Sequence, residues 1–178
     1  MTRFIAVISG KGGVGKTTSI INLGYALHKA GRRVLLLDAN LHTPNLASHL
    51  GFLNPPATLH NFIRREKELH EITYIHHSGI SFIPASTTYD ELHKIQPEQL
   101  VEVFEHLDDT MDYVLVDMSP GLGYDVSQVL QHTDETILIC NPNLSSVLDT
   151  LKSIELARDN DNIIPGVILT MTERGKHE

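Results

Sequence analysis

The feature that most constrains this chain is a glycine-rich segment near its N-terminus, Gly10–Thr17, with the sequence GKGGVGKT. It fits the pattern G-x-x-x-x-G-K-[ST], which is typical of loops that hold phosphate groups on backbone N–H groups. A short apolar run, Phe4–Ile8, precedes the segment, and apolar residues at helical spacing follow it up to Gly31. This predicts a buried strand, a phosphate-binding loop and a helix in succession.

Each residue type in the loop has a physical purpose. Glycines let the backbone fold tightly so that successive N–H groups point at phosphate oxygens, and the following helix adds the positive end of its dipole. Lys16 can reach the β- and γ-phosphates, and the Thr17 hydroxyl can coordinate Mg²⁺. We therefore predict binding of a nucleoside triphosphate, expected to be ATP with Mg²⁺. The predicted binding residues in this segment are Gly10, Lys11, Gly12, Gly13, Val14, Gly15, Lys16, Thr17 and Thr18.

Short apolar runs recur along the rest of the chain and alternate with segments of helical spacing. Continuous apolar strands that alternate with helices predict a parallel sheet covered on both faces. The further strands are expected at Val34–Leu37, Ile72–Ile75, Ile80–Ile83, Tyr113–Val116, Thr136–Cys140 and Ile163–Met171, the last entered through Pro165 and Gly166.

Turn and capping residues divide the intervening segments into helices. The sequence thus predicts an α/β fold, with a doubly wound, mostly parallel sheet and helices on both faces, in a single P-loop ATPase domain over residues 1–178. Such a fold usually continues past its last strand with another helix, so a C-terminally truncated or reduced form is left open. Helices are expected from Thr43-Pro44 to Gly51, Thr58 to Arg65, Pro97 to Leu107, Val126 to Gln131, and from Ser145 or Ser146 to Arg158.

Two aspartates end predicted strands beside the loop. Asp38 follows Val34–Leu37, and Asp117 follows Tyr113–Val116. Ligands gather at the carboxyl ends of strands in open α/β sheets, so both carboxylates are expected near the loop, where they can hold Mg²⁺ directly or through water. Gly121, shortly after Asp117, can bring a backbone N–H against the γ-phosphate and sense its loss.

Composition narrows the classes of function. The chain has 14 basic and 22 acidic residues, a formal charge of −8, and no marked basic patch, which makes direct DNA binding unlikely. The single Cys140 excludes an internal disulfide and a two-cysteine metal site within one chain. The 11 histidines are scattered without the spacing of a metal site, and His42 is the one closest to Asp38. The N-terminal apolar stretch is too short for a signal peptide, and no stretch is long enough to span a membrane. The lone Cys140 suits a reducing cytoplasm, so a cytoplasmic location is expected.

An additional lysine, Lys11, lies within the loop sequence KGGVGKTT. With this variant, the sequence resembles the MinD/ParA family of deviant Walker ATPases over nearly the whole chain, and the resemblance is closest to MinD-like proteins of archaeal type. Asp38–Leu46 looks like the first switch of that family, and Asp117–Gly123 looks like the second. Asn141, followed by Pro142 and a serine-rich helix start, is also similar and joins the predicted nucleotide-binding residues.

The resemblance implies an ATPase that cycles between a monomer and an ATP-dependent sandwich homodimer. In the family this cycle serves spatial positioning, such as placement of the division site, together with a regulatory protein partner that the sequence does not identify. Lys11 would reach the phosphates of the partner subunit, and Lys16 would neutralise phosphate charge within its own subunit. Thr17 and Asp38 would hold Mg²⁺, with Asp117 contributing through a metal-bound water.

Three positions depart from the family pattern. Asn40 stands where a second acid usually lies near the attacking water; an amide can orient water but is a poor base, so slow hydrolysis is expected, and Asn40→Asp is expected to raise turnover. Thr170 stands where an asparagine often contacts adenine. The chain ends at Glu178 without the basic amphipathic helix of membrane-attached members, so membrane association is expected only through partners.

The same residues allow other functions. An ATP-dependent binding switch with little hydrolysis would follow if Asn40 cannot replace the acid. A DNA-partitioning ATPase shares the motifs, but the acidic balance disfavours it. A metal-cluster carrier would need paired cysteines, and a small-molecule kinase would not explain Lys11. On the favoured interpretation the candidate catalytic residues are Lys11, Lys16 and Asn40.

Overall fold

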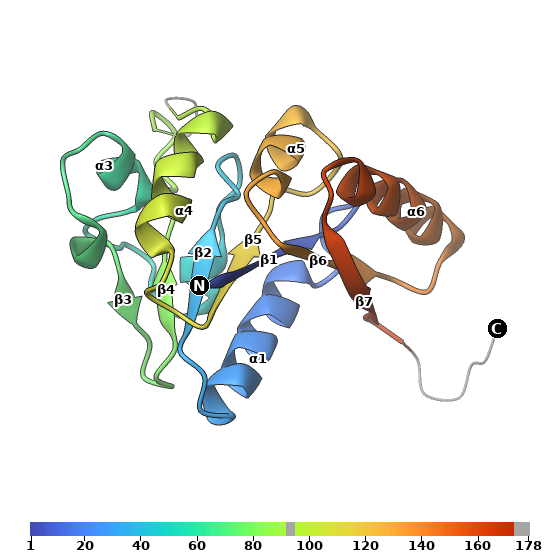
Figure 1. Ribbon diagram of the computed structural model, residues 1–178, viewed down its shortest axis with the longest axis horizontal. Helices are drawn as coiled ribbons and strands as arrows, with labels where there is room; N and C mark the ends of the chain where they lie inside the picture. The colour runs from blue at the N-terminus through green and yellow to red at the C-terminus, as the bar shows by residue number, and fades with distance from the viewer. Residues whose placement is uncertain (92–94, 173–178) are drawn as a thin grey trace.

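The structure, a computed structural model, describes residues 1–91 and 95–172. The described strands form a single sheet in the order β3-β4-β2-β5-β1-β6-β7 (Figure 1). Neighbouring strands run parallel, except β3 and β4, which are antiparallel. The strands are Arg3–Ile8 (β1), Val34–Asp38 (β2), Tyr74–Ile75 (β3), Ser81–Ile83 (β4), Tyr113–Asp117 (β5), Glu135–Cys140 (β6) and Ile163–Leu169 (β7).

Helices cover both faces of the sheet, as the sequence predicts. Figure 1 shows α1 on one side and α4, α5 and α6 on the other. Successive residues of β2 face opposite sides of the sheet. Leu36 belongs to the hydrophobic cluster that contains Ile20 of α1, and Leu35 belongs to the cluster that contains Phe104 of α4. The helices are Lys16–Lys29 (α1), Leu46–His49 (α2), Leu59–Ile63 (α3), Leu69–Glu71 (η1), Pro97–Leu100 (η2), Val101–Leu107 (α4), Tyr124–Leu130 (α5) and Leu144–Asp159 (α6).

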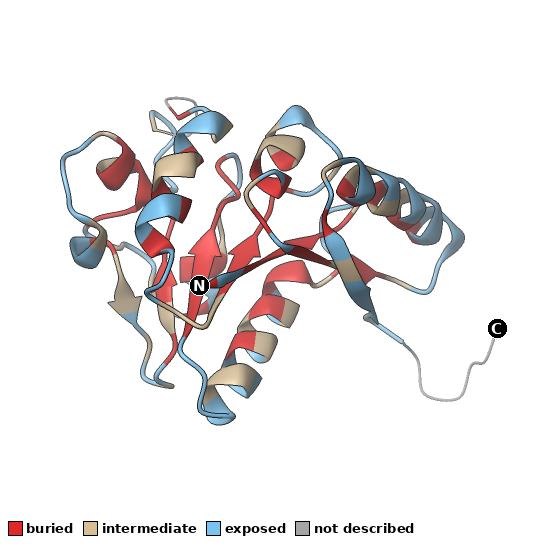
Figure 2. Cartoon of the chain, viewed as in Figure 1, coloured by how far each residue is buried: buried red, intermediate tan, exposed pale blue. Residues whose placement is uncertain are grey.

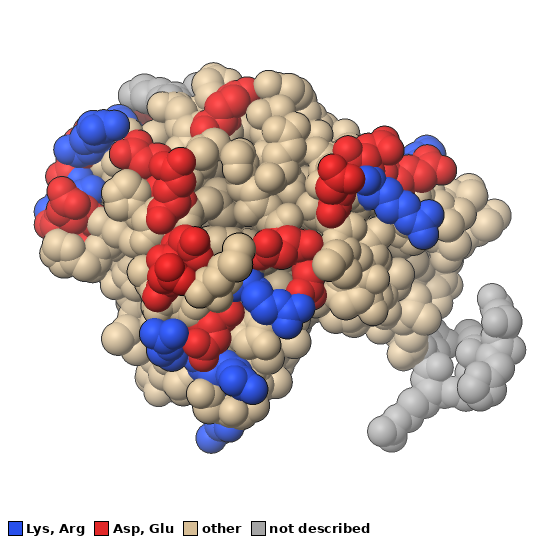
Figure 3. Space-filling model, in the orientation of Figure 1, with Lys and Arg blue, Asp and Glu red and all other residues tan. Residues whose placement is uncertain are grey.

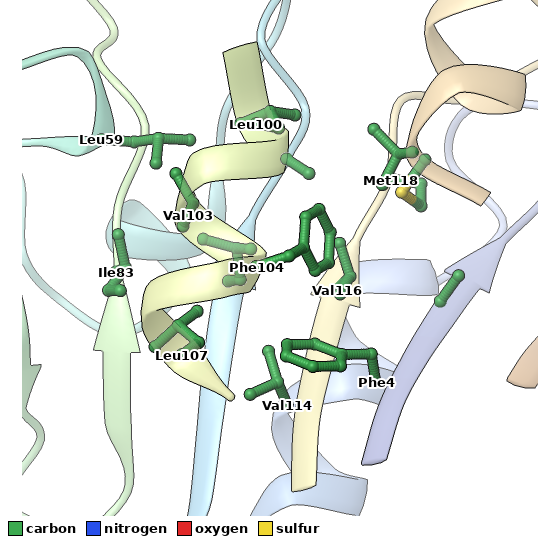
Figure 4. Close-up of a cluster of buried hydrophobic side chains, with 14 of the residues drawn as sticks. Phe4, Leu59, Ile83, Leu100, Val103, Phe104, Leu107, Val114, Val116 and Met118 are labelled. Carbon is green, nitrogen blue, oxygen red and sulfur yellow. The ribbon is translucent and has the colours of Figure 1, made fainter. Parts of the chain in front are cut away.

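Most residues of the central strands are buried because both faces of the sheet are covered (Figure 2). Figure 4 shows part of this core, where Phe4 of β1 packs edge to face against Phe104 of α4 with ring centroids 5.2 Å apart. Full burial of a side chain of this kind stabilises a fold by about 1.5–3 kcal/mol. The labelled neighbours are Leu59, Ile83, Leu100, Val103, Leu107, Val114, Val116 and Met118.

Several predicted boundaries differ from the structure. Asn45, not Thr43 or Pro44, is the N-cap of α2, and Asn143, not Ser145 or Ser146, is the N-cap of α6. The side chain of Asn143 accepts the N–H of Ser146 at 2.9 Å.

Two predicted strands also change in extent. Pro165 and Gly166 lie inside β7, where the pairing with β6 shifts register, and do not form its entrance. The predicted strand at Ile72–Ile75 keeps only Tyr74 and Ile75. The C-terminal residue Glu178 lies outside the described residues.

The strand β7 lies at one edge of the described sheet and differs from the central strands in burial. Ile163 is 67% exposed and Leu169 is 58% exposed. The sheet therefore places β1 near its centre and β7 at an edge. Among the described helices, none is both long and apolar enough to cross a bilayer.

Candidate functional site

The carboxyl ends of β1, β2 and β5 meet beside the glycine loop. Asp38 of β2 pairs directly with Asp117 of β5, and Val7 of β1 lies opposite the same Asp117. The loop from Ser9 to Gly15 leaves β1 at this point and enters α1. The parallel order of the strands therefore brings together the loop and the two aspartates, which are far apart in sequence.

Three glycines of the loop are required for different reasons. Gly13 and Gly15 have φ angles of 77° and 90°, in the left-handed region that favours glycine, and Gly15 is the N-cap of α1. Gly10 instead permits close packing, because a Cβ added there would lie 2.4 Å from the Cβ of Asp149 on α6. The loop is thus shaped by its own backbone and by the helix packed against it.

A cavity of about 420 Å³ opens over the loop and the start of α1. Most of the predicted loop residues line it, and so does Asn40, whereas Gly10 and Val14 are not among its lining residues. The lining also includes residues that the sequence analysis did not single out. The complete lining is Ser9, Lys11, Gly12, Gly13, Gly15, Lys16, Thr17, Thr18, Asn40, Thr43, Asn45, His49, Pro120 and Met171.

At the bottom of the loop, two side chains of α1 bind one carboxylate. The ammonium of Lys16 donates to Oδ1 of Asp117 at 2.6 Å, and the hydroxyl of Thr17 donates to Oδ2 of the same residue at 2.7 Å. All three residues are buried, and Asp117 is 0% exposed. The second partner of the Thr17 hydroxyl is Oδ1 of Asn45 at 2.8 Å. Asn45 is the polar neighbour that sequence analysis missed, because only the tertiary fold brings it to Thr17.

Asp38 is buried nearby and is held by backbone groups. Its carboxylate accepts the N–H of Asn40 at 3.2 Å and the N–H of Leu46 at 3.1 Å. Burial, with the charge of Asp117 in support, raises the pKa of Asp38 to about 7, although the two N–H donors and Lys16 oppose the shift. A bound cation would compensate the buried carboxylate of Asp38, whereas Asp117 already pairs with Lys16.

The oxygen donors present here fit Mg²⁺. Carboxylates and a hydroxyl are hard ligands, and Mg²⁺ in nucleotide sites takes only one or two protein oxygens besides phosphates and water. Within residues 1–91 and 95–172, no group of three or more His, Cys, Asp or Glu residues gathers as a metal site. Of the two predicted carboxylate ligands, Asp117 is the one to which the hydroxyl of Thr17 donates a hydrogen bond.

Lys11 points away from the base of the loop, toward α6. Its ammonium donates to the hydroxyl of Ser145 and lies 3.4 Å from Oδ2 of Asp149. The side chain remains 46% exposed. Lys11 and Lys16 therefore occupy different places, one at the rim and one at the bottom of the site.

Gly121 contacts the start of the loop, and Asn141 is connected to it through Thr170, but neither residue lines the cavity. Gly121, with a φ of 100°, donates its N–H to the carbonyl of Ser9 at 2.9 Å. The hydroxyl of Thr170 lies 2.7 Å from Oδ1 of Asn141 and 2.6 Å from the carbonyl of Val14. Thr170 thus ties the end of β7 to the glycine loop.

Charged side chains are mixed on the face shown in Figure 3. Lys and Arg side chains lie among Asp and Glu side chains on this face. Nε2 of His42 lies 4.0 Å from Oδ2 of Asp125, so this side chain faces α5. His42 does not line the cavity over the glycine loop.

Comparisons with known proteins agree with this geometry. A family model described as an AAA domain matches residues 2–163. An ATP-binding protein of Methanocaldococcus jannaschii is 33% identical over 93% of this chain and 62% of its own length. The antiactivator FleN of Pseudomonas aeruginosa is 35% identical over 85% of this chain and 55% of its own length. The chain therefore spans less than two thirds of these relatives.

The fold is also that of a solved structure. The septum site-determining protein MinD of Pyrococcus horikoshii, complexed with Mg-ADP, aligns with a TM-score of 0.90 and 33% identity. The alignment covers 100% of this chain and 73% of that protein.

Proposed function

The chain belongs to the MinD/ParA family of P-loop ATP-binding proteins, and on this premise we propose that it binds ATP with Mg²⁺, hydrolyses it, and cycles between a monomer and a sandwich dimer. The observation that carries the proposal is the buried group of Lys16, Thr17 and Asp117 beneath the glycine loop. A positive charge, a hydroxyl and a carboxylate at the start of a helix are the groups that a triphosphate and its metal require.

In this proposal each residue acts on a defined part of the nucleotide. Backbone N–H groups of Gly12, Gly13 and Gly15 bind phosphate oxygens. The ammonium of Lys16 leaves Asp117 and binds the β- and γ-phosphates. Thr17 and Asp38 hold the metal, and Asp117 contacts a metal-bound water. Mg²⁺ in this place would neutralise charge that develops on the transferred phosphate.

The proposed dimer places Lys11 at the phosphates of the partner subunit. Lys11 lies at the rim of the cavity beside α6, and α6 exposes apolar side chains toward solvent. Leu144 is 75% exposed and Leu151 is 52% exposed. An exposed apolar helix next to a half-exposed lysine suits a face that a second subunit covers.

The biological role is proposed by analogy with the relatives named above. We place the chain among proteins that act in spatial positioning, such as placement of the division site, working with a regulatory protein partner. We propose that residues 1–178 act as one P-loop ATPase domain, that the protein is cytoplasmic, and that any membrane association comes through partners.

A second candidate function is an ATP-dependent binding switch with little hydrolysis. Asn40 favours it, because a carboxamide is a poor base and because both polar atoms of this side chain already bind protein groups. The two candidates share the nucleotide site and differ in turnover alone.

Nucleotide binding and turnover test the proposal together. Lys16→Ala removes the ammonium that binds phosphate in this proposal. Because a hydrogen bond to a charged group contributes about 1.5–3 kcal/mol, the affinity for Mg-ADP should fall about 10–100-fold. Titration calorimetry measures the affinity, and phosphate release measures turnover. Lys29→Ala, at the other end of α1, is the matched control and should leave both unchanged. Equal affinity in wild type and Lys16→Ala would contradict the proposal.

A further inference from the structure

Two loops next to the cavity lie against each other. One is the β2–α2 loop (residues 39–45), and the other is the β5–α5 loop (residues 118–123). The ladder between β2 and β5 extends into them, because the N–H of Ala39 donates to the carbonyl of Asp117 at 2.9 Å. One step further along, a side-chain contact joins the loops: the hydroxyl of Ser119 donates to Oδ1 of Asn40 at 3.2 Å.

Asn40 is the centre of this contact. Its side chain is buried, with 3% exposed, and Ser119 is 6% exposed. Within its own loop, Nδ2 of Asn40 donates to the carbonyl of Thr43 at 2.7 Å, and Oδ1 accepts the N–H of Thr43 at 3.1 Å. The carboxamide therefore closes the β2–α2 loop on one side and binds the β5–α5 loop on the other.

The amide group is suited to this place in a way that a carboxylate is not. The contacts use one donor and one acceptor of the same side chain. An ionised aspartate could still accept the Thr43 N–H and the Ser119 hydroxyl, but it would face the Thr43 carbonyl without a proton to donate. The carboxylate oxygen would then lie beside the carbonyl oxygen of Thr43, so that two acceptors would face each other with no proton between them.

We propose that Asn40 is a positioning residue that joins the β2–α2 loop to the β5–α5 loop through Thr43 and Ser119. The two loops follow Asp38 and Asp117, so the carboxamide fixes how the segments after these aspartates are placed relative to each other. The inference builds on the proposed function, in which both aspartates serve the metal. It replaces the expectation that Asn40 acts chiefly on the attacking water.

Amide hydrogen exchange on the nucleotide-free full chain tests the link without relying on ATP hydrolysis. Asn40→Ala removes all side-chain contacts between this residue and Thr43, so exchange at the amides of residues 41–46 should accelerate about tenfold or more. Ser119→Ala removes only the contact from the other loop and should accelerate the same amides about threefold. Ser119→Thr keeps the hydroxyl and is the conservative control, with exchange close to wild type.

The double variant Asn40→Ala with Ser119→Ala decides whether the two residues act together. If they form one link, exchange in the double variant should equal that of Asn40→Ala alone, because the Ser119 contact no longer exists in that background. Independent, additive acceleration would overturn the proposal, and so would wild-type exchange at residues 41–46 in Ser119→Ala. Thermal unfolding of each variant checks that the exchange change is confined to these loops.

Turnover separates the positioning role from an action on water. A positioning role predicts that Asn40→Asp lowers kcat several-fold and that Ser119→Ala also lowers kcat. Ser119→Thr, which keeps the hydroxyl, should have a kcat close to that of wild type. In each variant KM should change less than kcat. A rise of kcat in Asn40→Asp would overturn the proposal. Absence of turnover in wild type would count against the proposed ATPase, and the exchange experiment would still decide on the link between the loops.

Discussion

Buried polar side chains in this protein differ in whether an opposite charge compensates them. Lys16 and Asp117 neutralise each other, but His60 of α3 forms no ion pair among the residues that the structure describes. Its Nδ1 accepts the N–H of Ser86 at 3.2 Å, so the proton of the neutral ring lies on Nε2, and Nε2 forms no hydrogen bond within the described residues. Burial lowers the pKa of His60 to about 4, with the charge of Glu91 opposing the shift.

This shift makes stability depend on pH. The folded chain keeps His60 neutral down to about pH 4, whereas the unfolded chain protonates it near its usual pKa of 6.5. Between these values the unfolded state binds the extra proton, so the free energy of unfolding should fall by about 1.4 kcal/mol per pH unit as pH decreases.

The expected result is a reduced acid dependence in His60→Phe, measured by urea unfolding at pH 7, 6 and 5. The phenyl ring keeps the volume but removes the acceptor for Ser86, so stability at pH 7 should also drop by about 1–3 kcal/mol. His70→Phe replaces an exposed histidine and should retain the wild-type dependence. An unchanged acid dependence in His60→Phe would show that another group carries it.

Single-residue roles were predictable where the chemistry is local. The loop pattern predicted Lys16 and Thr17 because their spacing from the glycines fixes where they lie. Asn45 was missed because its contact with Thr17 spans 28 positions and exists only once α1 and the β2–α2 loop are folded. The contact between Asn40 and Ser119 could not be predicted either, because it joins two loops that are 79 positions apart in sequence.

At the scale of elements, helix α6 links the glycine loop to the surface. Its backbone packs on Gly10, and its Asp149 lies 3.4 Å from the ammonium of Lys11. In the proposed dimer Lys11 leaves this helix to reach the partner subunit. The Asp149 carboxylate therefore competes with the partner's phosphates for the same lysine.

Removing the Asp149 carboxylate should therefore stabilise the ATP-bound dimer. Asp149→Asn removes an ion pair of about 0.2–1 kcal/mol from each of the two subunits, so the dissociation constant of the ATP-bound dimer should fall up to about 30-fold. Sedimentation velocity over a range of protein concentrations measures the constant. Asp159→Asn, at the other end of α6, is the matched control and should have no effect. A weaker dimer in Asp149→Asn would mean that the carboxylate supports assembly.

Elements themselves were predicted better than their ends. The strands from β1 to β7 follow from apolar runs, but both incorrect caps lie where several capping residues are close together. At α2 the carboxylate of Asp38, eight positions earlier, accepts the N–H of Leu46. At α6 the hydroxyl of Ser146 accepts the N–H of Asn141, five positions earlier, and is not used as a cap. The spacing of capping residues alone does not show which of these hydrogen bonds forms.

At the scale of the whole molecule, the alternation of strands and helices predicted the doubly wound sheet, since parallel strands require crossovers that cover both faces. The antiparallel pairing of β3 with β4 was not predicted, because both segments are short and carry no directional signal. The proposed cycle of assembly involves the whole molecule, with α6 and Lys11 on the face that a second subunit would cover.

The mass of the protein in solution tests this account most directly. Light scattering after size exclusion should give the mass of one chain without nucleotide and with Mg-ADP. With Mg-ATP, or a non-hydrolysable analogue if turnover is fast, it should give the mass of two chains. Lys11→Ala should remain at one chain in every state while still binding Mg-ADP. A wild-type mass of one chain in all nucleotide states, or an ATP-dependent dimer that persists in Lys11→Ala, would contradict the account.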